Sequence, residues 1–233
     1  MTFGHATAIW SDYPQLVPGV VAIDGITAAV DVRRHVAEYD AVARSRLETR
    51  SEGELPEIQA WRRVYARMGL KPTQYRCASE ALLRRFRKEG RLPQIHPLID
   101  LCNAISLAFA IPVAVFDSSK IGNDLEVRYA AGDETYETFS GELERPEPGE
   151  VIFVDNEGRA HARRWTNRQS GHSAVSASTS SALIVAEAMH DTGQADINGL
   201  VTAIARDVDR GWSADPTCAI LTGSSPRFEF RSG

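Results

Sequence analysis

The sequence predicts an α+β fold, built as a single domain over residues 1–233 with its core at about 16–222. Three observations lead to this prediction. Segments with helical periodicity come first, runs of β-type residues follow after Pro112, and strand and helix do not alternate regularly as they would in a doubly wound sheet. The length of 233 residues fits one large domain or two small ones, and an apolar fraction of 43% is enough for a sizeable core.

The first half of the chain contains one expected strand and several expected helices. The strand lies over 16–24, where a Pro-Gly pair sits in an apolar run. Pro56 suits the first turn of a helix, Ser79 can serve as an N-cap, and Gly90 is typical of a helix C-terminus. The helical segments that we expect are 26–49, 56–69, 79–90 and 97–108.

The second half reads mainly as strands, because β-type residues alternate with turn signals about every ten residues. The expected strands lie in VAVFD, LEVRYAAGD, TYETFSG, GEVIFVDNEG, AHARRW and ALIVAEAM. A last helix, INGLVTAIARDVDRGW, and a final strand, CAILTG, follow them. The serine-rich stretch 170–181 is expected to be a loop before a strand.

Composition and motifs exclude several classes of protein. The net charge of −5 argues against a uniformly basic nucleic-acid binder, so any RNA contact needs a local basic patch. No G-x-G-x-x-G or Walker loop is present. The longest apolar run, Ile105–Val115, is too short to span a bilayer, and the N-terminus lacks a signal-peptide layout. Three cysteines without a C-x-x-C pair fit a reducing compartment, so we expect a cytoplasmic protein without membrane contact.

Metal and nucleophile motifs are absent from the sequence. The six histidines form no H-E-x-x-H pair and none lies at zinc spacing from a cysteine, so no metal is expected. No G-x-S-x-G elbow surrounds any serine. A thiol nucleophile at Cys77 or Cys102 remains an alternative, although Cys102 lies on an apolar helix face, where an inert core residue is favoured.

A basic cluster in the stretch 161–169 is the candidate RNA contact. Guanidinium groups beside an indole suit phosphate binding combined with stacking on a base or sugar. In the alternative interpretation, the arginines pair with acids such as Asp155 and Glu157. The residues of this cluster are Arg163, Arg164, Trp165 and Arg168.

Asp100 and Asn103 form a polar pair on an otherwise apolar helix. They are three residues apart and are therefore neighbours on the helix surface. A buried polar group needs a hydrogen-bond partner, so at least one of the two is expected to be engaged. Either they tie the helix to the turn that follows it, or they line a polar pocket.

The stretch LPQIHPLIDLCNAISLAFAIPVAVFD resembles the signature of the editing domain, called B3/B4, of the bacterial phenylalanyl-tRNA synthetase β subunit. The segments LEVRYAAGDETYETFSGE, GEVIFVD and STSSALIVAEA fit later strands of that domain. The upstream helices and RRWTNRQ resemble free-standing B3/B4 proteins, which consist of the editing-type domain without a synthetase. The residues of the signature that match are Pro93, Ile95, Asp100, Asn103, Pro112, Phe116 and Asp117.

This resemblance implies a β-sandwich of unusual topology with packed helices. It also implies hydrolysis, in trans, of the ester bond of a wrongly charged aminoacyl-tRNA. The implied partner is the 3′ acceptor end of tRNA, with a synthetase as a further partner and no contact with DNA. No cofactor and no metal is implied.

The resemblance further assigns roles to individual residues. Glu187 would grip the α-amino group of the substrate or orient the hydrolytic water. Asp100 and Asn103 would order the floor of the pocket, and His96 would bond the terminal adenosine or shuttle a proton. Trp165 would stack, and the acceptor-end phosphates would be held by Arg163, Arg164 and Arg168.

The chain departs from the family pattern at several positions. Ala114 stands at the histidine position, Leu92 at an arginine and His96 at an asparagine. The family glutamate falls near Val185, and Glu187 lies two residues later, which keeps the side chain on the same strand face. Three interpretations follow: a trans-acting aminoacyl-tRNA deacylase, a non-catalytic module that binds tRNA or an amino acid, and a hydrolase of small aminoacyl esters.

Overall fold

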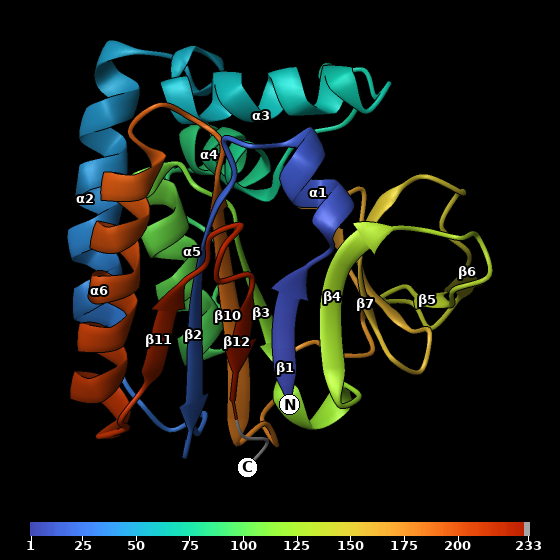
Figure 1. Cartoon of the computed structure of the whole chain (residues 1–233). Coiled ribbons are helices and arrows are strands. Elements are labelled where there is room, and N and C mark those ends of the chain that lie inside the picture. The colour runs from blue at the N-terminus through green and yellow to red at the C-terminus, as the bar shows by residue number, and fades with distance from the viewer. Residues whose placement is uncertain (231–233) are drawn as a thin grey trace.

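Six α-helices and twelve β-strands form the fold of residues 1–230, which are the residues that the computed structural model describes (Figure 1). The helices are α1 (Thr7–Asp12), α2 (Arg33–Thr49), α3 (Pro56–Arg67), α4 (Ala78–Glu89), α5 (Pro97–Phe109) and α6 (Gly193–Trp212), with 3₁₀ turns at Glu52–Glu54 and Ser118–Lys120. The strands are β1 (Thr2–His5), β2 (Val17–Asp24), β3 (Val113–Asp117), β4 (Asp124–Tyr129), β5 (Tyr136–Glu137), β6 (Leu143–Glu144), β7 (Val151–Asp155), β8 (Ala160–Arg163), β9 (Arg168–Gln169), β10 (Ser181–Ala188), β11 (Thr217–Ile220) and β12 (Arg227–Glu229).

The strands form two large sheets and one small one. The four-stranded sheet has the order β11-β2-β10-β3, and β10 runs antiparallel to both of its neighbours. The six-stranded sheet has the order β12-β1-β4-β7-β8-β9, and β1 runs parallel to β4. Strands β5 and β6 form a separate pair. This mixture of sheets and helices confirms the predicted α+β class.

The alternating side chains of β10 show how the layers pack. Leu183 and Val185 belong to the core shared with strands of the six-stranded sheet. Ile184 and Ala186 face the opposite way, into the core formed with α5 and α6. Figure 1 shows α2, α5 and α6 on one side of the four-stranded sheet and β1, β4 and β7 on the other. Glu187 continues the first set of side chains and therefore points into the interior of the sandwich.

Several local predictions are confirmed and others are wrong. Helix α5 begins at Pro97, and β3 spans the predicted VAVFD. Ser79 is not the N-cap of its helix, because α4 begins at Ala78 and Cys77 takes the cap position without a side-chain hydrogen bond. The stretch 26–32 is not helical, since α2 begins only at Arg33. Strand β1, helix α1 and strand β12 were not predicted at all.

The first and last described strands lie side by side. Strand β1 pairs antiparallel with β12 (Figure 1). The Met1 ammonium also donates a hydrogen bond to the Phe230 carbonyl at 3.0 Å. The fold therefore extends beyond the expected core of 16–222 on both sides. Within residues 1–230, no helix has both the length and the apolar character that a membrane crossing requires.

Candidate functional site

Glu187 is a buried carboxylate at the end of β10, with only 2% of its surface exposed. Its backbone N–H donates to the Pro112 carbonyl at 3.3 Å, and its backbone carbonyl accepts from Trp61 Nε1 at 3.2 Å. Pro112, just before β3, and Trp61 on α3 therefore hold the backbone of Glu187 from two sides, and the side chain projects between the two large sheets.

Two side-chain N–H groups satisfy the Glu187 carboxylate. His5 Nε2 lies 2.7 Å from Oε1, and Trp165 Nε1 donates to both carboxylate oxygens at 2.9 and 3.0 Å. A buried charge is costly unless it is hydrogen-bonded, so these contacts explain how an acid can occupy the sandwich interior. Sequence reasoning missed His5 and Trp61, because both lie far from Glu187 along the chain and belong to no motif.

A turn with a strained backbone at Arg164 and Trp165 places the Trp165 side chain beside the Glu187 carboxylate. Arg164 and Trp165 both have left-handed backbone angles, with φ of 47° and 58°, which bulky residues rarely adopt. Glu150 stabilises the turn, because its Oε1 accepts from the Arg164 backbone N–H at 2.9 Å and its carboxylate bonds the Arg163 guanidinium at 2.9 and 3.0 Å. Such strain persists where the surrounding contacts enforce it and is frequent at functional sites.

A small cavity of about 60 Å³ opens beside Glu187. Ala114 on β3 lies opposite Val185 in the strand register, and both line the cavity. The turn after Trp165 closes the other side with Asn167, Arg168 and Gln169. The sequence assigned Ala114 to the substrate pocket and Glu187 to catalysis, and in the structure these two residues share one cavity.

The arginine cluster differs from its expected role. Arg163 is only 4% exposed and forms ion pairs with Glu144 at 2.5 Å and Glu150 at 2.9 Å, while Arg168 also pairs with Glu144 at 3.1 Å. Arg163 and Arg168 thus pair with acids, as the alternative interpretation held, although with Glu144 and Glu150 instead of Asp155 and Glu157.

Trp165 also differs from its expected role as a stacking surface. Its side chain is fully buried, and the rings of Tyr13 and Trp61 pack edge-on against it with centroids at 4.9 and 5.3 Å. A base has no access to the indole in this arrangement. The indole is buried because its N–H donates hydrogen bonds to the Glu187 carboxylate inside the fold.

His96, Asp100 and Asn103 come together in a different place. They line a groove of about 890 Å³ between α2 and the beginning of α5. A helix of 13 residues is about 20 Å long. Ala114 follows the far end of this helix, so the structure does not join these three residues to the Glu187 cavity.

Two of these residues have structural partners at the beginning of α5. Asp100 accepts from the Ile95 backbone N–H at 2.8 Å, which ties the helix to the segment before it. His96 is the N-cap, and its Nδ1 accepts from the Leu98 N–H at 3.2 Å. The neutral ring therefore carries its proton on Nε2, which is buried without a partner among residues 1–230. Burial also lowers the pKa of His96, although Asp100 opposes this effect.

The two cysteines considered as nucleophiles are inert core residues. Burial raises the pKa of Cys77 to about 11 and that of Cys102 to about 12. Neither thiol provides appreciable thiolate near neutral pH.

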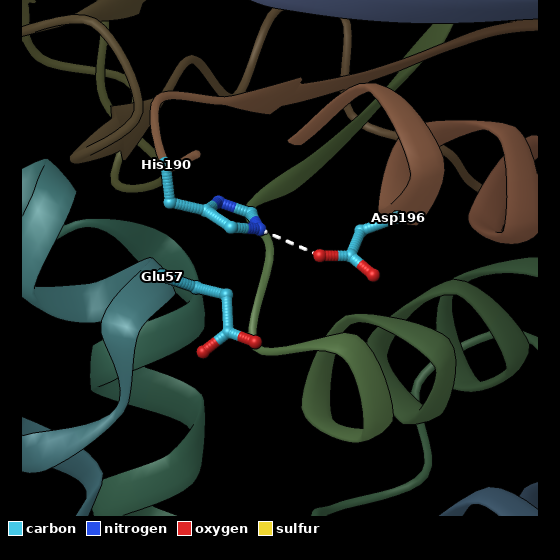
Figure 2. Close-up of side chains that lie close together, drawn as sticks. All are labelled: Glu57, His190 and Asp196. Carbon is cyan, nitrogen blue, oxygen red and sulfur yellow. Dashed lines mark hydrogen bonds and ion pairs between the residues drawn. The ribbon is translucent and has the colours of Figure 1, made fainter. Parts of the chain in front are cut away.

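Among residues 1–230, one group of side chains could hold a metal ion, although the sequence predicted none. Glu57, His190 and Asp196 each present one potential ligand atom, and these atoms lie within 4.8 Å of one another (Figure 2). The three residues are spread over α3, the end of β10 and α6, so no spacing in the sequence could have indicated the group.

Comparisons with known proteins agree with the resemblance seen in the sequence. The phenylalanine–tRNA ligase beta subunit of Legionella pneumophila (strain Lens) is 33% identical over 69 residues, which are 30% of this chain and 8% of that protein. The corresponding subunit of Nitrobacter winogradskyi is 32% identical over 79 residues, or 34% of this chain and 10% of that protein. The chain thus spans about a tenth of the length of these curated relatives.

A solved structure and a family model complete the comparison. An N-terminal fragment of the phenylalanyl-tRNA synthetase beta subunit from Pyrococcus horikoshii is similar at 15% identity and a TM-score of 0.41, over 54% of this chain and 45% of that one. The family model described as the B3/4 domain matches residues 60–221, which is more than half of the chain. The chain therefore belongs to the B3/4 domain family.

Proposed function

We propose that this protein is an aminoacyl-tRNA deacylase that acts in trans and hydrolyses the ester bond of a mischarged tRNA. The observation that carries the proposal is the cavity in which Ala114 and Glu187 meet. The family resemblance implies a pocket residue at the position of Ala114 and an acidic group near Val185, a role that we propose for Glu187 two positions later. The relatedness to phenylalanine–tRNA ligase beta subunits supports a role connected with tRNA and a synthetase.

The chemistry needs positioning more than a strong catalyst, because an aminoacyl ester is already labile. The Glu187 carboxylate is the group to bind the α-amino group of the substrate or to orient the attacking water. Gln169 and Asn167 line the same cavity, and each amide donates one hydrogen bond to a backbone carbonyl, of Val115 at 2.6 Å and of Arg76 at 2.8 Å. The second N–H of each amide is proposed as a donor for the developing oxyanion. No covalent nucleophile takes part in this scheme.

The cavity volume bears on the substrate side chain. A volume of about 60 Å³ is far smaller than an aromatic side chain requires. We therefore propose a small amino acid as the preferred ester, in a pocket bounded by Ala114 and Val185.

The tRNA contact is proposed for one arginine near the cavity. Arg164 has no carboxylate partner within residues 1–230 and stacks its guanidinium 5.0 Å from the Tyr75 ring, so it is the arginine of its cluster best suited to a phosphate. The groove with His96, Asp100 and Asn103 does not serve the terminal adenosine in this scheme, because that nucleoside carries the ester on its own ribose and must lie beside Glu187. A tRNA substrate implies a cytoplasmic site of action.

A second candidate function is hydrolysis of small aminoacyl esters. It is favoured by the pairing of Arg163 and Arg168 with Glu144, which removes two of the three expected phosphate contacts. The same cavity and the same Glu187 would then serve a substrate without RNA.

The test is deacylation of a panel of mischarged tRNAs, with Glu187→Gln as the variant and Glu48→Gln, an exposed acid on α2, as its matched control. Turnover of esters of small amino acids, lost only in Glu187→Gln, supports the proposal. Turnover of small esters but not of charged tRNA supports the second candidate. Salt-dependent tRNA binding without any turnover would leave a non-catalytic module and would overturn both.

A further inference from the structure

We propose that Glu57, His190 and Asp196 form a binding site for one divalent transition-metal ion of the zinc class. Glu57 lies in the first turn of α3, His190 just after β10, and Asp196 in the first turn of α6. One ligand atom from each residue lies within 4.8 Å of the other two. Figure 2 shows the His190 imidazole edge turned toward Asp196, with the Glu57 carboxylate beside the two.

The burial of the group indicates that it is more than a surface cluster. Glu57 is 8% exposed and His190 is 7% exposed. Oε2 of Glu57 and Nδ1 of His190 are buried without a hydrogen-bond partner among residues 1–230. A buried carboxylate oxygen without a partner is costly, and a cation bound by that carboxylate would remove the cost.

The donor set favours a transition metal over magnesium or calcium. One imidazole nitrogen and two carboxylates suit Zn²⁺, whereas Mg²⁺ and Ca²⁺ prefer oxygen ligands alone. Zinc bonds to such ligands are about 2.0–2.2 Å long, which places the ligand atoms of one ion about 3.4 Å apart. The three atoms, now within 4.8 Å of one another, must therefore approach by up to about 1.4 Å when the ion binds. The ion would take the place of the proton in the 2.8 Å hydrogen bond between His190 Nε2 and Asp196 Oδ2. Asp196, which is 35% exposed, leaves a route to solvent and room for a water ligand.

The neighbouring charges set the strength of the site. Glu57 and Asp196 bring two negative charges, and Arg46 Nη2 binds Glu57 Oε1 at 2.7 Å and offsets one of them. Arg46 thus occupies one oxygen and leaves the other to the ion. Thr192 Oγ1 donates to Asp196 Oδ2 at 2.5 Å and helps to orient that ligand.

The site adjoins the Glu187 cavity without sharing residues with it. His190 follows Glu187 by three positions, and Trp61, one helical turn after Glu57 on α3, donates to the Glu187 carbonyl. A bound ion would therefore fasten α3 and α6 to the end of the strand that carries Glu187. This inference does not depend on the proposed hydrolase activity.

The experiment is calorimetric titration of chelator-treated full-length protein with ZnCl₂ and, separately, MgCl₂. We expect saturable binding of one Zn²⁺ per chain, an accompanying rise in thermal midpoint, and no comparable response to Mg²⁺. Asp196→Asn keeps the shape of the side chain and should weaken Zn²⁺ binding at least tenfold, and His190→Ala should abolish it. His172→Ala, at a partly exposed histidine outside the group, is the matched control and should bind as the parent does.

Each other result overturns the proposal. The site is refuted if the parent protein binds no Zn²⁺, or if binding persists unchanged in Asp196→Asn. Loss of Zn²⁺ binding in His172→Ala would show that the ion binds at His172 and not at the proposed group. An equal response to Mg²⁺ would refute the assignment to a transition metal. Should His190→Ala fail to fold, Asp196→Asn alone decides the question.

Discussion

At the scale of single residues, the Glu187 carboxylate depends on donors from distant parts of the chain. The indole N–H of Trp165 serves both of its oxygens and His5 serves one. A hydrogen bond to a charged group contributes more than one between neutral groups, and its loss leaves a buried charge under-satisfied. The hydrogen bonds from Trp165 to Glu187 therefore offset the backbone strain of the turn at Trp165.

Trp165→Phe tests this dependence, because it keeps an aromatic ring and removes the N–H. We expect the free energy of unfolding to fall by about 1.5–3 kcal/mol. Trp10→Phe is the matched control, since Trp10 Nε1 is buried without a partner among residues 1–230 and its removal breaks no hydrogen bond. Urea denaturation measures both variants, and equal losses would contradict the assigned role.

A second residue-scale feature is the buried pair of Asp155 and His161, whose side chains lie 3.1 Å apart. Burial alone would raise the pKa of Asp155. Hydrogen bonds from His161 and from the backbone N–H groups of Arg159 and Gly122 outweigh that effect and hold the pKa at about 2. Because the folded-state pKa lies below the ordinary 3.8, the ionised form stabilises the fold above about pH 4 and this contribution is lost as the pH falls toward 2.

Asp155→Asn should therefore lower the free energy of unfolding by about 2 kcal/mol at pH 7. The difference from the parent protein should shrink as the pH falls from 4 toward 2, because the parent then loses the same contribution. Denaturant titrations at pH 7, 5 and 3 measure this trend, with Asp209→Asn on the exposed face of α6 as control. A difference that stays constant with pH would show that the carboxylate charge is not the cause.

At the scale of elements, α6 packs closely on β2 at Gly19. A methyl group there would lie 2.6 Å from Val201 Cγ2 and 2.7 Å from Ile197 Cγ2. Both side chains belong to the helix, so the absence of a side chain at Gly19 sets how near the helix can approach the sheet.

Gly19→Ala should therefore overpack this contact and lower the free energy of unfolding by about 1–3 kcal/mol. Gly223→Ala is the control, because an added methyl there meets no atom within 4 Å, and we expect a change below about 0.5 kcal/mol. Thermal unfolding of the two variants separates these outcomes. A Gly19→Ala protein as stable as the parent would mean that α6 can shift freely.

The elements that could be predicted from the sequence are those with strong local signals. Proline at the first helical position marked α3 and α5, and the left-handed Gly90 marked the end of α4. The missed strands β1 and β12 have only four and three residues, too few for alternation to be recognised. The N-cap at Ser79 was wrong because Cys77 holds that position without any capping side chain.

At the scale of the whole molecule, the candidate site lies where the two large sheets meet. His5 comes from the six-stranded sheet and Glu187 from the four-stranded sheet. That Glu187 faces the interior could be predicted from the period of two along β10. The hydrogen-bond partners of Glu187 could not be predicted from the sequence, because His5 is 182 positions away and only the packing of the two sheets brings it near.

A double-mutant cycle on His5 and Glu187 measures this link between the sheets. Each single change to Ala leaves the other side chain buried without its partner. The double variant should therefore lose about 1–3 kcal/mol less free energy of unfolding than the two single changes lose together. The same His5→Ala change combined with Asp207→Asn, on α6 in the helical layer, should be additive within about 0.5 kcal/mol. Additivity of both pairs, measured by urea denaturation, would mean that the sheets are joined by apolar packing alone.

The adjacency of β1 and β12 has a consequence for how such a fold can be used. A domain whose first and last strands lie side by side can be inserted into a surface loop of another protein without distorting that loop or its own fold. The antiparallel pairing of Thr2 with Glu229 provides such a point. The same geometry would suit a circular permutant in which a short linker joins β1 to β12 and the chain is opened in the serine-rich loop before β10.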